Sequence, residues 1–196
     1  MFFNGTISLP AYGSLFVCYG QSNSSLAVND VLQGQKQVVP MVGKDAQSWD
    51  IAFRESGITL KDQVLFDWSQ HDDDRIRYFS GHARYKTAFK QKSKVKGRAW
   101  LSLPHVKDIA HVWVNGKDCG IAWTAPYEVE ITGAFKKGNN TIEIEVVNTW
   151  HNALRGADLG KAPYEGIWTN AKYRTKGDAL LPAGLLEPPM IITTTK

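Results

Sequence analysis

Pairs of acidic residues spaced two apart are the first candidates for chemistry. Hydrolysis by paired carboxyl groups needs them about 5 to 10 Å apart, one of them with a raised pKa. Glu143 and Glu145 alternate with apolar residues, as do Glu128 and Glu130, so on strands each pair would share a face at about 7 Å. Neither pair has the apolar surroundings that raise a carboxyl pKa. We therefore predict that both pairs keep a sheet face hydrated, and we identify no catalytic residue in this chain.

Other reactive patterns are weaker still. The sequence has no Gly-x-Ser-x-Gly motif, its five histidines lack metal-ligand spacing, and Cys18 and Cys119 are about a hundred residues apart. The run His71–Asp74 offers oxygen atoms that Ca²⁺ prefers, but it lacks the glycine and the distal glutamate of an EF-hand loop. We expect a solvated acidic loop there, no metal site and no cofactor, with a structural Ca²⁺ ion as the open alternative.

Seven basic residues lie between Arg84 and Arg98, without an acidic residue among them. Such a run is compatible with phosphate binding, but it contains few aromatic residues and no Gly-rich loop opens a helix. We expect a strand, a hairpin tip and a second strand, with the lysines protecting a sheet edge. Nucleic acid is therefore not an expected partner.

Aromatic residues are more informative, since the chain holds seven tryptophans in 196 residues. The segment Asn148–Asp158 combines an aromatic ring with amide, guanidinium and carboxylate groups. Neutral sugars are held by an aromatic face together with fixed hydrogen bonds to hydroxyl groups. The alternative is that Trp150 closes the end of the fold while the polar side chains satisfy loop backbone. The candidate carbohydrate-binding residues are Trp150, His151, Asn152, Arg155, Asp158 and Trp168.

Short alternating segments predict an all-β antiparallel sandwich to position these residues. Asn115-Gly116 between two such segments predicts a tight hairpin. One-turn helices are expected only near Asp62–Trp68 and Ala134–Lys137. The expected strands are Gly13–Tyr19, Ile51–Phe53, Tyr85–Phe89, Ala99–Leu103, Ala110–Val114, Lys117–Trp123, Tyr127–Ile131, Thr141–Val146 and Met190–Thr193.

Composition places the chain among ordinary globular proteins, with 43% hydrophobic and 21% charged residues and a net charge of +4. No segment has the roughly 18 consecutive apolar residues of a membrane span. The polar stretch Gln21–Asn29 resembles a linker. We therefore predict an N-terminal strand and linker over 1–45, either a remnant of a preceding domain or an edge strand, and a sandwich over 46–196.

An ordered set of motifs over residues 47 to 192 resembles the sugar-binding jelly roll of glycoside hydrolase family 2. The tail, Asn148–Asp158 together with Leu180–Leu186, resembles the C-terminal β-sandwich of the α-L-rhamnosidases of glycoside hydrolase family 106. The motifs that carry the first resemblance are Ile76–Phe89, Leu101–Leu103, Val112–Lys117, Gly120–Trp123, Pro126–Thr132 and Gly138–Thr141.

The resemblance implies a galactose-binding-domain-like jelly roll that is non-catalytic and packs on the catalytic domain of a larger glycoside hydrolase. It implies neutral oligosaccharide or polysaccharide as a ligand near the Asn148–Asp158 segment, and an extracellular or periplasmic location. A self-sufficient lectin-like carbohydrate-binding module and a purely structural docking domain are the alternatives. An independent enzyme is the least favoured interpretation.

Overall fold

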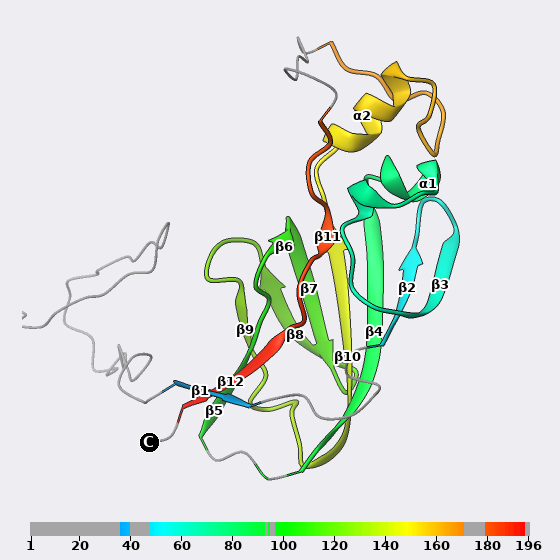
Figure 1. Ribbon diagram of the computed structural model, residues 1–196. Helices are drawn as coiled ribbons and strands as arrows, with labels where there is room; N and C mark the ends of the chain where they lie inside the picture. Colours follow the sequence, from blue (N-terminus) through cyan, green and yellow to red (C-terminus); the bar gives the residue numbers. More distant parts are fainter. Residues whose placement is uncertain (1–35, 40–47, 93, 95–96, 171–178, 195–196) are drawn as a thin grey trace, which may run out of the picture.

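The computed structural model describes residues 36–39, 48–92, 94, 97–170 and 179–194. Two antiparallel sheets face each other, one with the strand order β1-β12-β5-β9 and the other with the order β3-β2-β4-β10-β7-β8 (Figure 1). Strands β11 and β6 form a separate two-stranded ladder. The all-β antiparallel sandwich is thus confirmed. The elements are β1 (Lys36–Val39), β2 (Trp49–Phe53), β3 (Ile58–Gln63), η2 (Trp68–Gln70), α1 (Asp74–Arg77), β4 (His82–Gln91), β5 (Arg98–Ser102), β6 (Val106–Lys107), β7 (Ile109–Val114), β8 (Lys117–Ala122), β9 (Glu128–Glu130), β10 (Gly138–Val147), α2 (His151–Asp158), β11 (Gly184–Leu185) and β12 (Met190–Thr194).

The two ten-residue strands β4 and β10 form the centre of the larger sheet. Every second residue of each is buried, as alternation predicts. Ile142 and Ile144 face the core, whereas Glu143 and Glu145 face outward. The Asn115-Gly116 hairpin is also confirmed, because it joins β7 to β8 with φ angles of 53° and 77° at the two turn residues.

Two helix predictions were wrong. Asp62 and Gln63 end strand β3, and the helical turn η2 begins only at Trp68, where the Asp67 side chain accepts a hydrogen bond from Ser69 N. Residues 134–137 form no helix; a turn precedes β10 instead. Conversely, the segment interpreted as a loop after Asn148 contains the helix α2.

The basic run does not form a hairpin. Its first part is strand β4 of the larger sheet and its last part begins β5 of the smaller sheet, so the connection crosses between sheets. Strand β1, from the segment 1–45, pairs with β12 at the edge of the smaller sheet. The strand expected at Gly13–Tyr19 lies outside the described residues.

A buried junction fixes the C-terminal segment to the core. The Tyr85 hydroxyl accepts hydrogen bonds from Trp68 Nε1 (2.6 Å) and Leu185 N (3.2 Å), and burial raises the pKa of Tyr85. Gly184, at φ 104°, passes directly beside these side chains; an added Cβ would lie 2.7 Å from Trp68 Cε2 and 2.8 Å from the Tyr85 oxygen. Only glycine fits this position without displacing the junction.

Gly184→Ala should therefore lower the free energy of unfolding more than Gly120→Ala. Gly120 has nearly the same φ, 99°, but an added Cβ there meets nothing within 4 Å. The control isolates backbone strain, about 1 to 2 kcal/mol, and overpacking should add about 1 to 3 kcal/mol at Gly184. Chemical denaturation of both variants measures the difference; equal losses would contradict the close approach.

Candidate functional site

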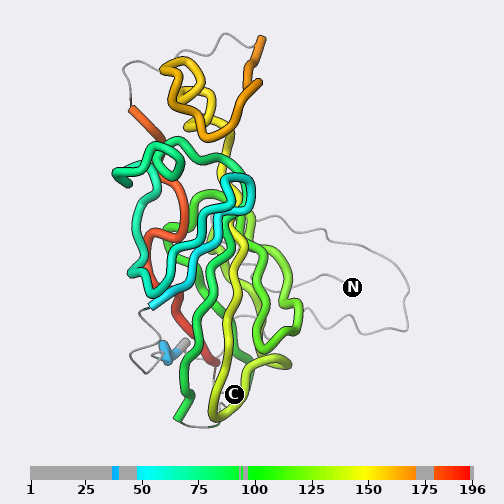
Figure 2. Tube along the Cα trace, turned by 90° about the vertical axis from the view of Figure 1, so that its right-hand side faces the viewer, coloured from blue at the N-terminus to red at the C-terminus, as the bar shows by residue number. Residues whose placement is uncertain are grey.

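The helix α2 lies at one end of the molecule, over the turn Phe79-Ser80-Gly81 that leads into β4 (Figures 1 and 2). Ser80 is fully buried in this turn. Its Oγ donates to the Thr149 carbonyl (2.8 Å) and accepts from Ala153 N (3.2 Å). One hydroxyl group thus connects the turn to both the start and the first turn of α2.

The Asn148 side chain fixes the same turn from the end of β10. Its Nδ2 donates to the Phe79 carbonyl (2.9 Å), and its Oδ1 accepts from Gly81 N (3.0 Å). Buried backbone groups without a strand partner need such side-chain partners. Asn148 therefore has a structural role in this chain.

The other side of the turn is closed by Glu55 and His82. Glu55 accepts from His82 N (2.9 Å) and contacts His82 Nδ1 (2.6 Å). Burial would raise the pKa of Glu55, but the hydrogen bonds from His82 lower it overall, so the carboxylate stays charged. Gly81, at φ 147°, leaves room for it, since an added Cβ would lie 2.6 Å from Glu55 Cδ.

Tyr164 completes the enclosure and supports the aromatic candidate Trp150. Its hydroxyl accepts from Ser80 N (2.9 Å) and donates to the Ser80 carbonyl. Burial raises the pKa of Tyr164 to about 12, so this donor remains protonated at neutral pH. The Tyr164 and Trp150 rings meet edge to face at 5.8 Å, which orients an indole that is 55% exposed.

Three polar candidates lie on one side of α2, because His151, Arg155 and Asp158 follow a helical spacing of four and then three. Arg155 Nη1 lies 3.5 Å from Asp158 Oδ2 in an ion pair. His151 Nε2 lies 3.5 Å from the Ala179 carbonyl. These groups thus follow one another along the helix that begins after Trp150, with the Arg155 side chain only 15% exposed.

Asn152 and Trp168 differ from the other candidates. Asn152 is 2% exposed, and its amide exchanges hydrogen bonds with the backbone of Leu181, at 2.8 Å as donor and 2.9 Å as acceptor. It connects α2 to the C-terminal segment rather than facing solvent. Trp168 is 78% exposed on the segment that follows α2.

Sequence reasoning missed an apolar component of this end. Leu159 directly follows α2, Leu181 is connected to it by Asn152, and both expose about half of their surface. Together with Trp150 and Trp168 they form what we call the α2-end surface. Large apolar side chains that a rigid scaffold holds in solvent are typical of contact surfaces.

The carboxylate pairs have no catalytic geometry. Glu145 pairs with Arg54 (2.7 Å) and Arg84 (3.2 Å), and Glu143 pairs with Lys86 (3.1 Å) on the outer sheet face. Both glutamates of β10 therefore take part in ion pairs that cross to the neighbouring strands. Asp73, in the acidic run, is engaged by Arg75 at 2.6 Å, which lowers the Asp73 pKa to about 2.

Within the described residues, no cluster of three or more His, Cys, Asp or Glu side chains is arranged to hold a metal ion. No helix in the same part of the chain is long and apolar enough to cross a membrane.

Comparison with known proteins agrees with the fold. Residues 63–176 match the family described as glycosyl hydrolase 2 galactose-binding domain-like. A putative β-glucuronidase of Formosa agariphila is 34% identical over 143 residues, which are 69% of this chain and 12% of that protein. This chain therefore spans only about an eighth of the curated relative.

Solved structures give the same picture. A rhamnosidase from Novosphingobium sp. PP1Y is 36% identical with a TM-score of 0.66, over 84% of this chain and 16% of that one. A β-D-glucuronidase from Dictyoglomus thermophilum, 22% identical over 82% of this chain and 28% of its own, has a TM-score of 0.55 and shares the fold.

Tyr164→Phe should loosen the turn under α2 while keeping the ring contact with Trp150. It leaves the buried backbone N–H and carbonyl of Ser80 without their partner, which costs about 1 to 3 kcal/mol. Hydrogen exchange should show faster exchange at residues 79–81 and in α2, and denaturation should show the global loss. Tyr127→Phe is the control, because no described residue bonds the Tyr127 hydroxyl; equal effects of both variants would refute the role of Tyr164.

Proposed function

This chain belongs to the glycosyl hydrolase 2 galactose-binding-domain-like family, and we propose that it serves as a non-catalytic domain of a larger α-L-rhamnosidase-like glycoside hydrolase, of the family 106 type. The observation that carries this proposal is the match to the Novosphingobium rhamnosidase, which covers most of this chain but a sixth of the enzyme. A domain of that relative size leaves the chemistry to another part of the protein. The ion-paired carboxylates of the sheet face support the same interpretation.

The α2-end surface is the part we assign to contact with the catalytic domain. Its scaffold is rigid, since Ser80, Asn148 and Tyr164 hold the turn beneath it. Its exposed side chains are mainly apolar, and burying such a side chain against a partner contributes roughly 1.5 to 3 kcal/mol. We therefore place the interdomain contact at this end of the sandwich.

Sugar contact is the second function we assign to this end. Trp150 offers an oriented ring, the helix that follows it carries the polar groups of His151, Arg155 and Asp158, and Trp168 offers a further ring. Asn152 contributes by holding Leu181 in place. A self-sufficient lectin-like module is the alternative. The exposed ring of Trp150 favours this alternative, because a sugar could reach it without a partner domain.

Titration of the full chain with rhamnose and with rhamnose- and galactose-containing oligosaccharides separates these alternatives. If the chain alone binds sugar at the α2-end surface, Trp150→Ala should weaken affinity by about tenfold or more, as loss of an aromatic contact residue does at binding hot spots. Trp123→Ala is the matched control, since Trp123 is similarly exposed but follows β8. No binding by the folded chain would favour the docking role; loss of binding with the control instead would refute the α2-end assignment.

The non-catalytic role has its own test. The purified chain should not hydrolyse aryl rhamnosides or aryl glucuronides at a rate above the buffer blank. Should turnover occur, the double variant Glu143→Gln/Glu145→Gln decides its origin. Turnover that this variant abolishes would contradict a non-catalytic domain, as would unchanged turnover that stays with the chain through a second purification step.

A further inference from the structure

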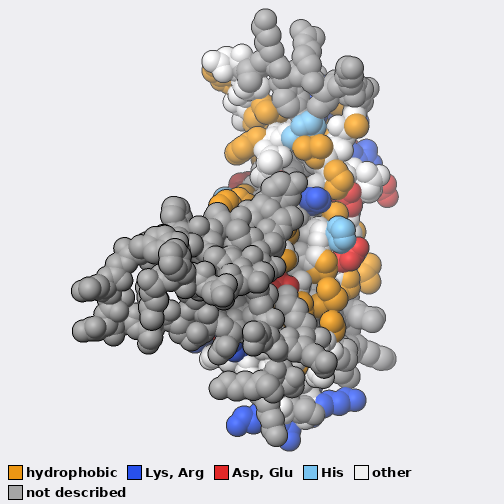
Figure 3. Space-filling model, turned by 90° about the vertical axis from the view of Figure 1, so that its left-hand side faces the viewer, with side chains coloured by type: hydrophobic (Ala, Val, Ile, Leu, Met, Phe, Trp, Pro, Cys, Tyr) orange, Lys and Arg blue, Asp and Glu red, His pale blue; other side chains and the backbone are white. Residues whose placement is uncertain are grey.

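Two basic segments that are about 40 residues apart in the sequence meet at the end of the sandwich opposite α2. The first, with Lys92 and Lys94, follows β4, and the second, with Lys136 and Lys137, leads into β10. The pairing of Gly138 with Gln91 places Lys137 beside Lys92 at this end. Figure 3 shows Lys and Arg side chains gathered there.

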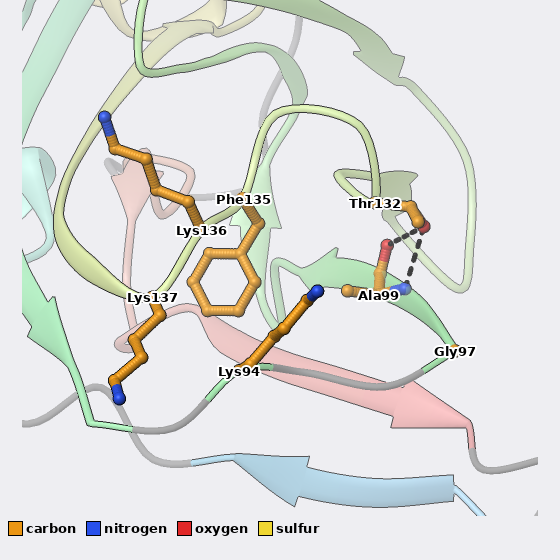
Figure 4. Close-up of a pocket in the computed structure, with 7 residues that line it drawn as sticks. All are labelled: Lys94, Gly97, Ala99, Thr132, Phe135, Lys136 and Lys137. Carbon is orange, nitrogen blue, oxygen red and sulfur yellow. Dashed lines mark hydrogen bonds between the residues drawn. The ribbon is translucent and has the colours of Figure 1, made fainter.

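An open pocket of about 340 Å³ lies between these segments. Ala99 and Thr132 form one wall, closed by hydrogen bonds between the Ala99 backbone and the Thr132 hydroxyl. Figure 4 shows the Phe135 ring at the centre of the pocket, with the Lys94 side chain running alongside it. The far side of this ring stacks on Phe89 at 6.1 Å, so Phe135 is fixed in position.

The pocket carries uncompensated positive charge. Lys94, Lys136 and Lys137 line it, all three are exposed, and none is ion-paired with any residue that the structure describes. No Asp or Glu occurs in residues 84–98 or 131–142. A concave site lined by charges of one sign concentrates ions of the opposite sign.

The carboxylate of Glu130, which is bonded to the Thr132 wall of the pocket, is already ion-paired. Glu130 accepts from the Thr132 hydroxyl at 2.8 Å, but both of its oxygens are also bonded by Arg98, at 3.0 and 2.5 Å. This arrangement lowers the pKa of Glu130, and in the described part of the chain no acidic side chain forms an ion pair with the pocket lysines. Figure 4 shows that the three ammonium groups surround the pocket, with the Lys136 and Lys137 side chains pointing away from the Phe135 ring in different directions.

We propose that this pocket binds an anionic substituent, a sulfate or a carboxylate, of an acidic polysaccharide, with the sugar ring lying against Phe135. The lysines supply the charge, and the fixed aromatic ring supplies the apolar face that sugar C–H groups pack on. A single ring suits a saccharide better than a nucleic acid strand, whose binding uses aromatic side chains for successive bases. This second site is independent of the proposed docking at the α2 end.

Binding should be measured with the full chain against sulfated dextran, uncharged dextran of the same length, oligogalacturonate and duplex DNA. We expect binding to sulfated dextran or oligogalacturonate, weakened by added salt, and none to dextran. The preferred anion distinguishes a sulfate from a carboxylate ligand. Failure to bind both acidic saccharides, or tighter binding to DNA, would overturn the assignment while leaving the docking role untouched.

A charge-matched pair of variants locates the binding. Lys94→Gln/Lys136→Gln/Lys137→Gln should reduce affinity for the acidic saccharide by about tenfold or more, the combined effect of three exposed charge contacts. The control Lys61→Gln/Lys86→Gln/Lys161→Gln removes the same charge from β3, the outer face of β4 and the segment after α2, and it should change affinity less than threefold. Equal losses in the two triple variants would mean diffuse attraction and would refute the pocket.

The ring is tested separately by Phe135→Leu, which keeps an apolar side chain against Phe89. We expect affinity to fall roughly two- to tenfold at unchanged salt dependence. Thermal unfolding monitors the fold of every variant. Should Phe135→Leu fail to fold, the two triple variants, which change only exposed side chains, still decide the site.

Discussion

The buried turn Phe79-Ser80-Gly81 is the constraint on which the α2 end depends. Its backbone groups are removed from water yet belong to no strand, so side chains must satisfy them. Asn148, at the end of β10, and Tyr164, after α2, provide those bonds, although they are about 70 to 85 residues away in the sequence. The turn therefore cannot close correctly unless the segment that carries the candidate site folds against it.

This dependence explains why α2 is a rigid platform although it is short. Isolated helices of this length are unstable in water. The Ser80 hydroxyl accepts a hydrogen bond from Ala153 N, and the Asn152 side chain donates one to the Leu181 carbonyl. The helix also packs closely on Tyr78, since an added Cβ at Gly156 would lie 2.7 Å from Tyr78 Cβ. Tertiary contacts thus fix the helix and, with it, the direction of Trp150.

The same contacts explain what the sequence could not predict. The alternation of polar and apolar residues was sufficient to predict strands β4 and β10, because each strand buries every second residue. The buried residues of α2 are Asn152, Ala153 and Gly156, two of them small and one polar, so no apolar period marks the helix. The six site candidates could be selected by residue type, but the burial of Asn152 and the exposed leucines of the α2-end surface depend on packing partners far away in the chain.

The sandwich separates two surfaces of different chemistry. Strands β4 and β10 run the length of the larger sheet, with α2 beyond one end (Figure 1). The residues that line the basic pocket lie at the other end, where Gly138 pairs with Gln91. The outer face between the two ends carries an ion-pair ladder of Arg84, Lys86, Glu143 and Glu145 at its centre, with the exposed side chains of Ile109 and Ile121 on the neighbouring strands β7 and β8. A partner domain that covers the apolar α2 end would therefore leave the lysine pocket accessible. One domain could then be docked at one end while its other end holds the charged groups of a polymeric substrate.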